Sequence, residues 1–158
     1  MTATLYNPTD IIDAYESWKA NCGPAAVAAI LGCEVNDLRE CFPLFPKKAW
    51  ANPTLIRQVL TDRKIRHHNT DRSRRGGWPM FGLAFLQIEG PWLAEGVPIS
   101  AAYRSTHWIA VSDRAVFDVN AGQWIPGAEW KADLMPQIVE ATPRGTGWHL
   151  RLGIEVLP

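Results

Sequence analysis

Apolar side chains in the first 64 residues recur at the three- and four-residue spacing of helices. The pattern predicts helices over residues 8–18, 25–31, 34–42 and 52–64. Thr9 and Asp10 offer an N-cap for the first of these helices, and Pro24 suits the first turn of the second. Gly32 then ends the second helix, because glycine accepts the left-handed backbone of a helix end. The N-terminal part of the chain is therefore expected to be helical.

The pattern changes after residue 70. Residues 70–79 are rich in Asp, Ser, Gly and Pro, which is typical of a loop. Short runs of β-branched and aromatic residues follow, separated by turn residues, and they predict strands over 83–88, 97–103, 107–112, 115–119 and 148–156. Residues 128–141 are a last helix candidate, interrupted at Pro136. Helices followed by four or five mostly antiparallel strands make an α+β layout.

Length and composition fit one domain spanning residues 1–158. Of these 158 residues, 47% are hydrophobic and 20% charged, which suits a single core. The formal net charge of +0 argues against nucleic acid as the main partner. No run approaches the roughly 18 apolar residues of a membrane span, and the N-terminus shows no secretory signal. The odd set of 3 cysteines argues against a disulfide framework and fits a reducing compartment.

Other patterns add less chemistry. A basic cluster before Trp78 could face nucleic acid or an acidic partner, but a solvated loop fits the zero net charge better. This cluster consists of Arg63, Lys64, Arg66, His67, His68, Arg72, Arg74 and Arg75. Cys33, Cys41 and His149 lack the spacing of a zinc site, so no metal and no cofactor are expected. Most of the 8 tryptophans are expected to be core rings.

Cys22 is the candidate nucleophile. It lies at the start of the predicted helix 25–31, followed by Gly23 and Pro24. The partial positive charge and free N–H groups of a helix N-terminus lower the pKa of a thiol and favour the reactive thiolate. Gly23 lets a substrate backbone approach closely. The alternative is that Cys22 is a small buried apolar residue, as unpaired cysteines often are.

His107 supplies a candidate base. It opens the predicted strand 107–112, and a turn at Asp113 and Arg114 leads into the return strand 115–119. A hairpin of this length brings Asp118 or Asn120 back to His107, where either side chain can hold the imidazole ring. Asp118 is preferred, because a carboxylate inside a strand needs a reason, whereas Asn120 is explained by the turn that follows. Both lie on one face of the strand, so both can approach the ring.

These segments resemble a known family. Residues 21–27 (NCGPAAV), 107–111 (HWIAV) and 117–122 (FDVNAG) look like the three blocks of papain-like cysteine peptidases, above all the bacteriocin-processing C39 type. The blocks cover a small part of the chain, and their order matches over nearly all of it. The whole also resembles small uncharacterised proteins of bacteriophages and prophages. The resemblance implies a papain-like fold with N-terminal helices packed on the sheet, Cys22 as nucleophile, His107 as general base and acid, and Asp118 as its orienter.

The sequence departs from that family at one place. The peptidases it resembles carry a Gln a few residues before the Cys, whose amide donates to the oxyanion hole, whereas Glu16 stands near that place here. An ionised carboxylate cannot donate a hydrogen bond. The indole N–H of Trp18, the side chain of Asn21 or the backbone N–H of Cys22 could replace the missing donor.

Two functions remain open from the sequence. The first is a papain-like cysteine hydrolase that acts on peptide, isopeptide or amide bonds of a peptide or protein substrate through a thioester on Cys22. The second is a papain-like scaffold with altered catalysis that serves as a phage-borne binding protein, inhibitor or virion component. Either would act in the bacterial cytoplasm or in a virion. The sequence leaves the oligomeric state, and the choice between proteolysis and deamidation or acyl transfer, open.

Overall fold

One antiparallel sheet forms the centre of the protein. The computed structural model describes residues 22–45, 47–48 and 50–158. Within them the sheet has six strands in the order β1-β6-β2-β3-β4-β5, and every neighbouring pair is antiparallel. The strands are β1 (His67–Asn69), β2 (Phe81–Glu89), β3 (Thr106–Ser112), β4 (Ala115–Asp118), β5 (Gln123–Pro126) and β6 (Gly147–Val156). The fold is α+β, as the sequence predicts.

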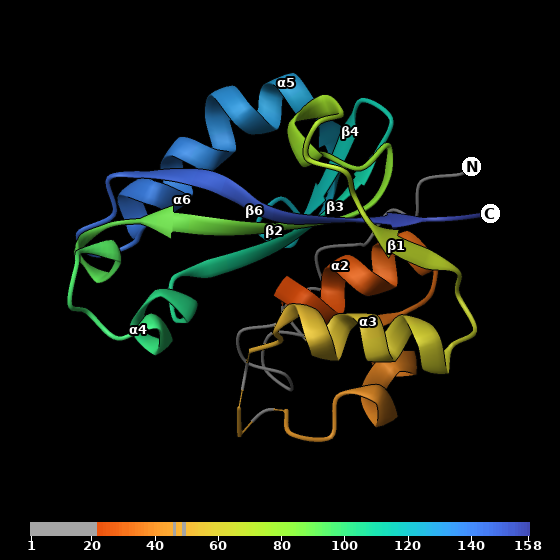
Figure 1. Cartoon of the computed structure of the whole chain (residues 1–158). Coiled ribbons are helices and arrows are strands. Elements are labelled where there is room, and N and C mark those ends of the chain that lie inside the picture. The colour runs from red at the N-terminus through yellow and green to blue at the C-terminus, as the bar shows by residue number, and fades with distance from the viewer. Residues whose placement is uncertain (1–21, 46, 49) are drawn as a thin grey trace.

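Helices cover both faces of this sheet. In Figure 1, α2 (Cys22–Leu31) and α3 (Pro53–Asp62) lie on one side, and α5 (Gly127–Glu129) and α6 (Met135–Ala141) lie on the other. Between α5 and α6 the chain makes a π-helical turn, η4 (Trp130–Leu134). The sheet is therefore the middle layer of three.

Each helical layer encloses its own apolar core. Leu83 and Phe85 of β2 belong to the core under α2, whereas Ala84 and Leu86 belong to the core under the second layer. Successive residues of a strand point to opposite faces, so a strand in the middle layer must be apolar at every position. Residues 82–88 are accordingly all buried. This double burial explains why the sequence at 83–88 is apolar except for Gln87, whose buried amide donates to the backbone carbonyls of Ile88, Ala102 and Ser105.

Most of the predicted helices are present. The predictions at 25–31 and 52–64 are confirmed by α2 and α3, and Asn52 caps α3 by accepting a hydrogen bond from the backbone N–H of Leu55 at 2.8 Å. The segment 34–42 is a 3₁₀ helix, η1 (Val35–Cys41). The predicted helix 8–18 lies outside the described residues.

The predicted strand at 97–103 is wrong. This segment contains a short helix, α4 (Ile99–Tyr103), which Pro98 precedes. Pro98 has no N–H to give to a strand ladder, and the Ala pair that follows favours a helix. The sequence pattern also missed β5, whose four residues are too short to show an alternation.

The last helix candidate is continuous where the sequence predicts an interruption. Pro136 lies in the first turn of α6, and the chain is helical from α5 through η4 to α6. Pro136 lacks an N–H and its ring crowds the carbonyl one turn earlier. The preceding turn is wider than an α-turn, and the N–H of Met135 donates to the carbonyl of Trp130, five residues back.

The described part of the chain contains no membrane-spanning helix, no disulfide and no cluster of metal ligands. No helix there is long and apolar enough to cross a bilayer. Cys22, Cys33 and Cys41 form no disulfide. No group of three or more His, Cys, Asp or Glu side chains there is arranged to hold a metal ion.

Candidate active site

Cys22 is the first residue of α2, at the end where a helix exposes its backbone N–H groups. The side chain is half-buried. The next residue, Gly23, is closely packed: a Cβ added there would lie 3.0 Å from the Cβ of Ala51 and 3.4 Å from Cδ1 of Trp108. The indole N–H of Trp108 in turn donates to the carbonyl oxygen of Ala51 at 2.8 Å. The start of α2 is thus held against β3 and the segment before α3.

The sulfur of Cys22 contacts β3 beyond the end of the β3–β4 ladder. The β3–β4 ladder runs from Ser112 and Ala115 to Ala110 and Phe117 and then ends. Beyond that point the backbone N–H of Trp108 donates to the sulfur of Cys22, and the His107 ring also hydrogen-bonds the sulfur. The structure therefore brings together Cys22 and His107, which are 85 positions apart in the sequence.

Asp118 holds the other side of the His107 ring. Nε2 of His107 lies 2.9 Å from Oδ2 of Asp118, which leaves Nδ1 to face Cys22. Asp118 is fully buried and His107 is only 7% exposed, so water does not compete for this contact. Asn120 is exposed and does not hold the ring. Its backbone N–H and side-chain amide donate to Oδ1 of Asp118 at 2.9 and 3.0 Å. The ring is oriented by Asp118, the residue that the sequence favours.

Trp130 supplies a further hydrogen bond to the carboxylate of Asp118. The indole N–H of Trp130 donates to Oδ2 of Asp118 at 2.9 Å. Trp130 comes from η4, in the layer opposite α2. Nothing in the spacing of the sequence marks this tryptophan among the eight of the chain.

The three side chains shift one another's protonation. Burial raises the pKa of the Cys22 thiol, but the hydrogen bond and charge of His107 and the N–H of Trp108 outweigh it and hold that pKa below its ordinary value. Burial lowers the pKa of His107, but the charge and hydrogen bond of Asp118, together with Cys22, raise it to about 10. Burial raises the pKa of Asp118, and the charge and hydrogen bond of His107 more than compensate, so it lies below its ordinary value. The charged forms of Cys22 and His107, a thiolate and an imidazolium, therefore stabilise each other.

The expected oxyanion donors are only partly described. Trp18, Asn21 and Glu16 lie outside the described residues. The backbone N–H of Cys22 remains as the candidate donor at the start of α2.

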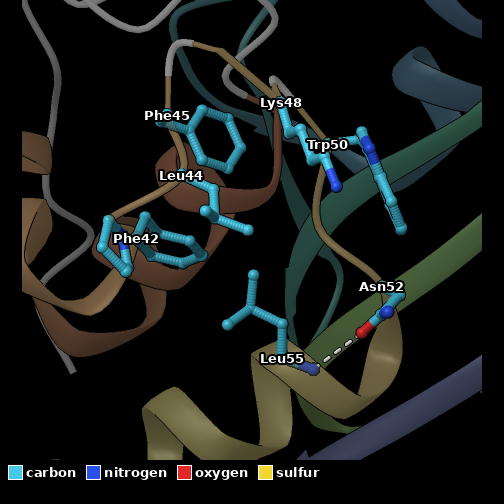
Figure 2. A pocket seen from close by; sticks show the side chains of 8 residues that line it. Phe42, Leu44, Phe45, Lys48, Trp50, Asn52 and Leu55 are labelled. Carbon is cyan, nitrogen blue, oxygen red and sulfur yellow. Dashed lines mark hydrogen bonds between the residues drawn. The ribbon is translucent and has the colours of Figure 1, made fainter.

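An apolar pocket is formed by the segment between η1 and α3 and by the start of α3. It has a volume of about 300 Å³. In Figure 2, Leu44 and Leu55 point into it from opposite sides. Its lining consists of Phe42, Pro43, Leu44, Phe45, Lys48, Trp50, Asn52 and Leu55. Trp50 and Asn52 flank Ala51, the residue packed against Gly23, so part of the pocket lining is adjacent in sequence to the segment that contacts the start of α2.

Trp78 and the basic cluster that precedes it have no contact with Cys22, His107 or Asp118 among those described. Trp78, after the basic cluster, packs edge-on against Trp130 and Trp148 in the second core. Most side chains of the basic cluster are exposed, and Nδ1 of His67 bonds the carbonyl of Ile65 at 2.8 Å.

Comparisons of the chain with protein-family models, with curated proteins and with solved structures gave no match. The function is therefore inferred from the residues and the geometry of Cys22, His107 and Asp118.

Proposed function

We propose that this protein is a papain-like cysteine hydrolase that cleaves a peptide, isopeptide or amide bond through a thioester on Cys22. The observation that carries the proposal is the hydrogen-bonded chain from Cys22 through His107 to Asp118. Nucleophile, base and orienter in this order form the arrangement that activates a thiol for acyl transfer. The depressed pKa of Cys22 and the raised pKa of His107 support the same roles.

In the proposed reaction, the Cys22 thiolate attacks the carbonyl carbon of the scissile bond and forms a tetrahedral oxyanion. The bond to nitrogen breaks as His107 gives its proton to the leaving amine, and the acyl group remains on sulfur as a thioester. His107 then takes a proton from water, whose oxygen attacks the thioester carbonyl. The thiolate leaves, so one amide and one water yield an acid and an amine. Asp118 keeps the ring aligned throughout.

The apolar pocket supports a peptide or protein as substrate. Aromatic and aliphatic side chains form most of its lining, and one wall continues into the segment that contacts Gly23. A large apolar side chain of the substrate would bury its surface there while the adjoining backbone reaches Cys22. We place the reaction in the cytoplasm of a bacterial host or in a virion.

Alkylation of the three cysteines, followed residue by residue by mass spectrometry across pH, tests the proposal. Cys22 is expected to react with a midpoint well below the ordinary value of about 8.5. Cys33 is the internal control, because burial raises the pKa of its thiol. Peptides with and without a large apolar residue are then assayed for cleavage, which Cys22→Ala should abolish without loss of folding.

Two results would contradict the proposal. One is turnover that survives in Cys22→Ala, which would remove the thiol from the mechanism. The other is a Cys22 that alkylates no more readily than Cys33 in a protein without turnover. That outcome would favour the alternative, a scaffold that binds a partner without cleaving it.

A further inference from the structure

Asp118 accepts four hydrogen bonds, the full acceptor capacity of a carboxylate. Oδ1 accepts from the backbone and the side chain of Asn120, and Oδ2 accepts from His107 and from Trp130. The two donors on Oδ2 are both ring N–H groups, each at 2.9 Å. His107 therefore shares the charge of this oxygen with an indole.

The indole of Trp130 is fixed independently of Asp118. It is 2% exposed and packs edge-on against Trp148, with ring centroids 5.3 Å apart, and against Trp78 at 6.3 Å. Its backbone carbonyl accepts the π-type hydrogen bond from Met135. The N–H of Trp130 thus reaches Asp118 from a rigid support in the layer opposite α2.

We infer that Trp130 is a positioning residue of this site: its indole N–H fixes Oδ2 of Asp118 against Nε2 of His107 and takes up part of the negative charge of that oxygen. The inference rests on the proposed function. Without the indole donor, His107 would be the only donor on Oδ2, and the carboxylate would attract the imidazolium proton more strongly. An imidazolium that holds its proton too tightly delivers it slowly to a leaving amine. Trp130 therefore keeps His107 able to release a proton.

The titration of His107, followed by NMR of its ring in the Cys22→Ala protein, tests this role without any need for turnover. The ionisable groups that face His107 in the described structure are Cys22 on α2 and Asp118 on β4, so this background leaves Asp118 alone. Adding Trp130→Phe should move the titration midpoint of His107 to higher pH, by about half a pH unit or more. Trp148→Phe is the matched control. It makes the same change in a ring of the same aromatic cluster that has no described contact with Asp118, and the midpoint of His107 should stay in place.

A purely structural Trp130 would behave differently. Trp130→Phe would then destabilise the fold but, like Trp148→Phe, leave the His107 titration unchanged, which would overturn the inference. If Trp130→Phe fails to fold, benzothienylalanine at position 130 keeps the ring shape and lacks the N–H, and the same shift is expected. In the protein with Cys22 intact, Trp130→Phe should lower kcat about tenfold with KM unchanged. A His107 shift in a protein that shows no turnover would leave the positioning role standing and reject the proposed hydrolase alone.

Discussion

At the scale of single residues, the carboxylate of Asp118 connects three side chains of the site through hydrogen bonds. A fully buried charge is costly unless hydrogen bonds and an opposite charge compensate for it. Asp118 is 0% exposed and receives both kinds of compensation, from His107, Asn120 and Trp130. Asn120, which the sequence offers as an alternative orienter, instead holds the orienter in place. Asn120 therefore holds Asp118, and Asp118 holds His107.

Asp118→Asn tests whether the charge or only the shape of this side chain is needed. Each oxygen of Asp118 accepts two hydrogen bonds. Whichever way the amide of Asn is turned, its NH₂ group would face two N–H donors and could not accept from them, so stability should fall by about 1–3 kcal/mol. The pKa of His107 should also fall, because the charge that raises it is gone. Cys22 then loses its cationic partner, and its alkylation midpoint should rise toward about 8.5. The measurements are urea unfolding and the pH profile of alkylation.

The control is Asp113→Asn, at the exposed turn between β3 and β4. Asp113 has a φ of 52°, a conformation that Asn also tolerates, so neither stability nor alkylation should change. An alkylation midpoint that is the same in Asp118→Asn as in the wild type would show that the carboxylate does not act on the thiol through His107.

At the scale of elements, the site depends on how the start of α2 is seated against β3. Gly23 allows the approach, because any side chain there would press on Ala51 and Trp108. The end of the β3–β4 ladder at Ala110 frees the N–H of Trp108 for the sulfur of Cys22. The first residue of α2 and the end of the β3–β4 ladder therefore meet at the sulfur of Cys22.

Gly23→Ala should shift this seat and thereby the reactivity of Cys22. The new Cβ would lie 3.0 Å from the Cβ of Ala51, which is attached to the backbone and cannot rotate away. A displacement of a few tenths of an ångström weakens the contact of Cys22 with His107, so alkylation at neutral pH should slow about tenfold. Ala51→Gly in the same chain removes the opposing methyl group and should restore the rate. If the double variant stays as slow as Gly23→Ala, crowding at Ala51 is not the cause.

Local signals in the sequence were enough to locate part of this arrangement. Pro24 in the first turn of α2 and the hairpin of β3 and β4 are short-range patterns, and the structure contains both elements. The strand predicted at 97–103 failed because Val97 and Tyr103 dominate the pattern although most of the segment is helical and exposed. The contact of Trp130 with Asp118 depends on packing between layers, which no periodicity records.

At the scale of the whole molecule, the candidate site joins all three layers. Cys22 comes from the helical layer on one face, and His107 and Asp118 lie in the sheet. Trp130 comes from the opposite face (Figure 1). Misplacing either layer therefore disturbs the site, and the protonation of the site in turn contributes to global stability.

The pH dependence of unfolding should reveal that contribution. Burial lowers the pKa of His107, but Asp118 and Cys22 raise it above its ordinary 6.5, to about 10. A group whose folded pKa is raised adds stability that is fully present below the unfolded pKa and is lost as the pH rises through the folded pKa.

In a Cys22→Ala background, where no thiolate titrates at this site, the His107→Gln change should therefore reduce the free energy of unfolding most below pH 6.5. That cost should exceed about 1.4 kcal/mol, the equivalent of one pKa unit, and should decline as the pH rises through the folded pKa of His107, which Asp118 alone raises in this background. His149→Gln is the control, because His149 meets Glu89 at the exposed surface, and its small cost should vary little with pH. If the cost of His107→Gln were as flat with pH as that of His149→Gln, the buried pair would not exist as an ion pair in solution.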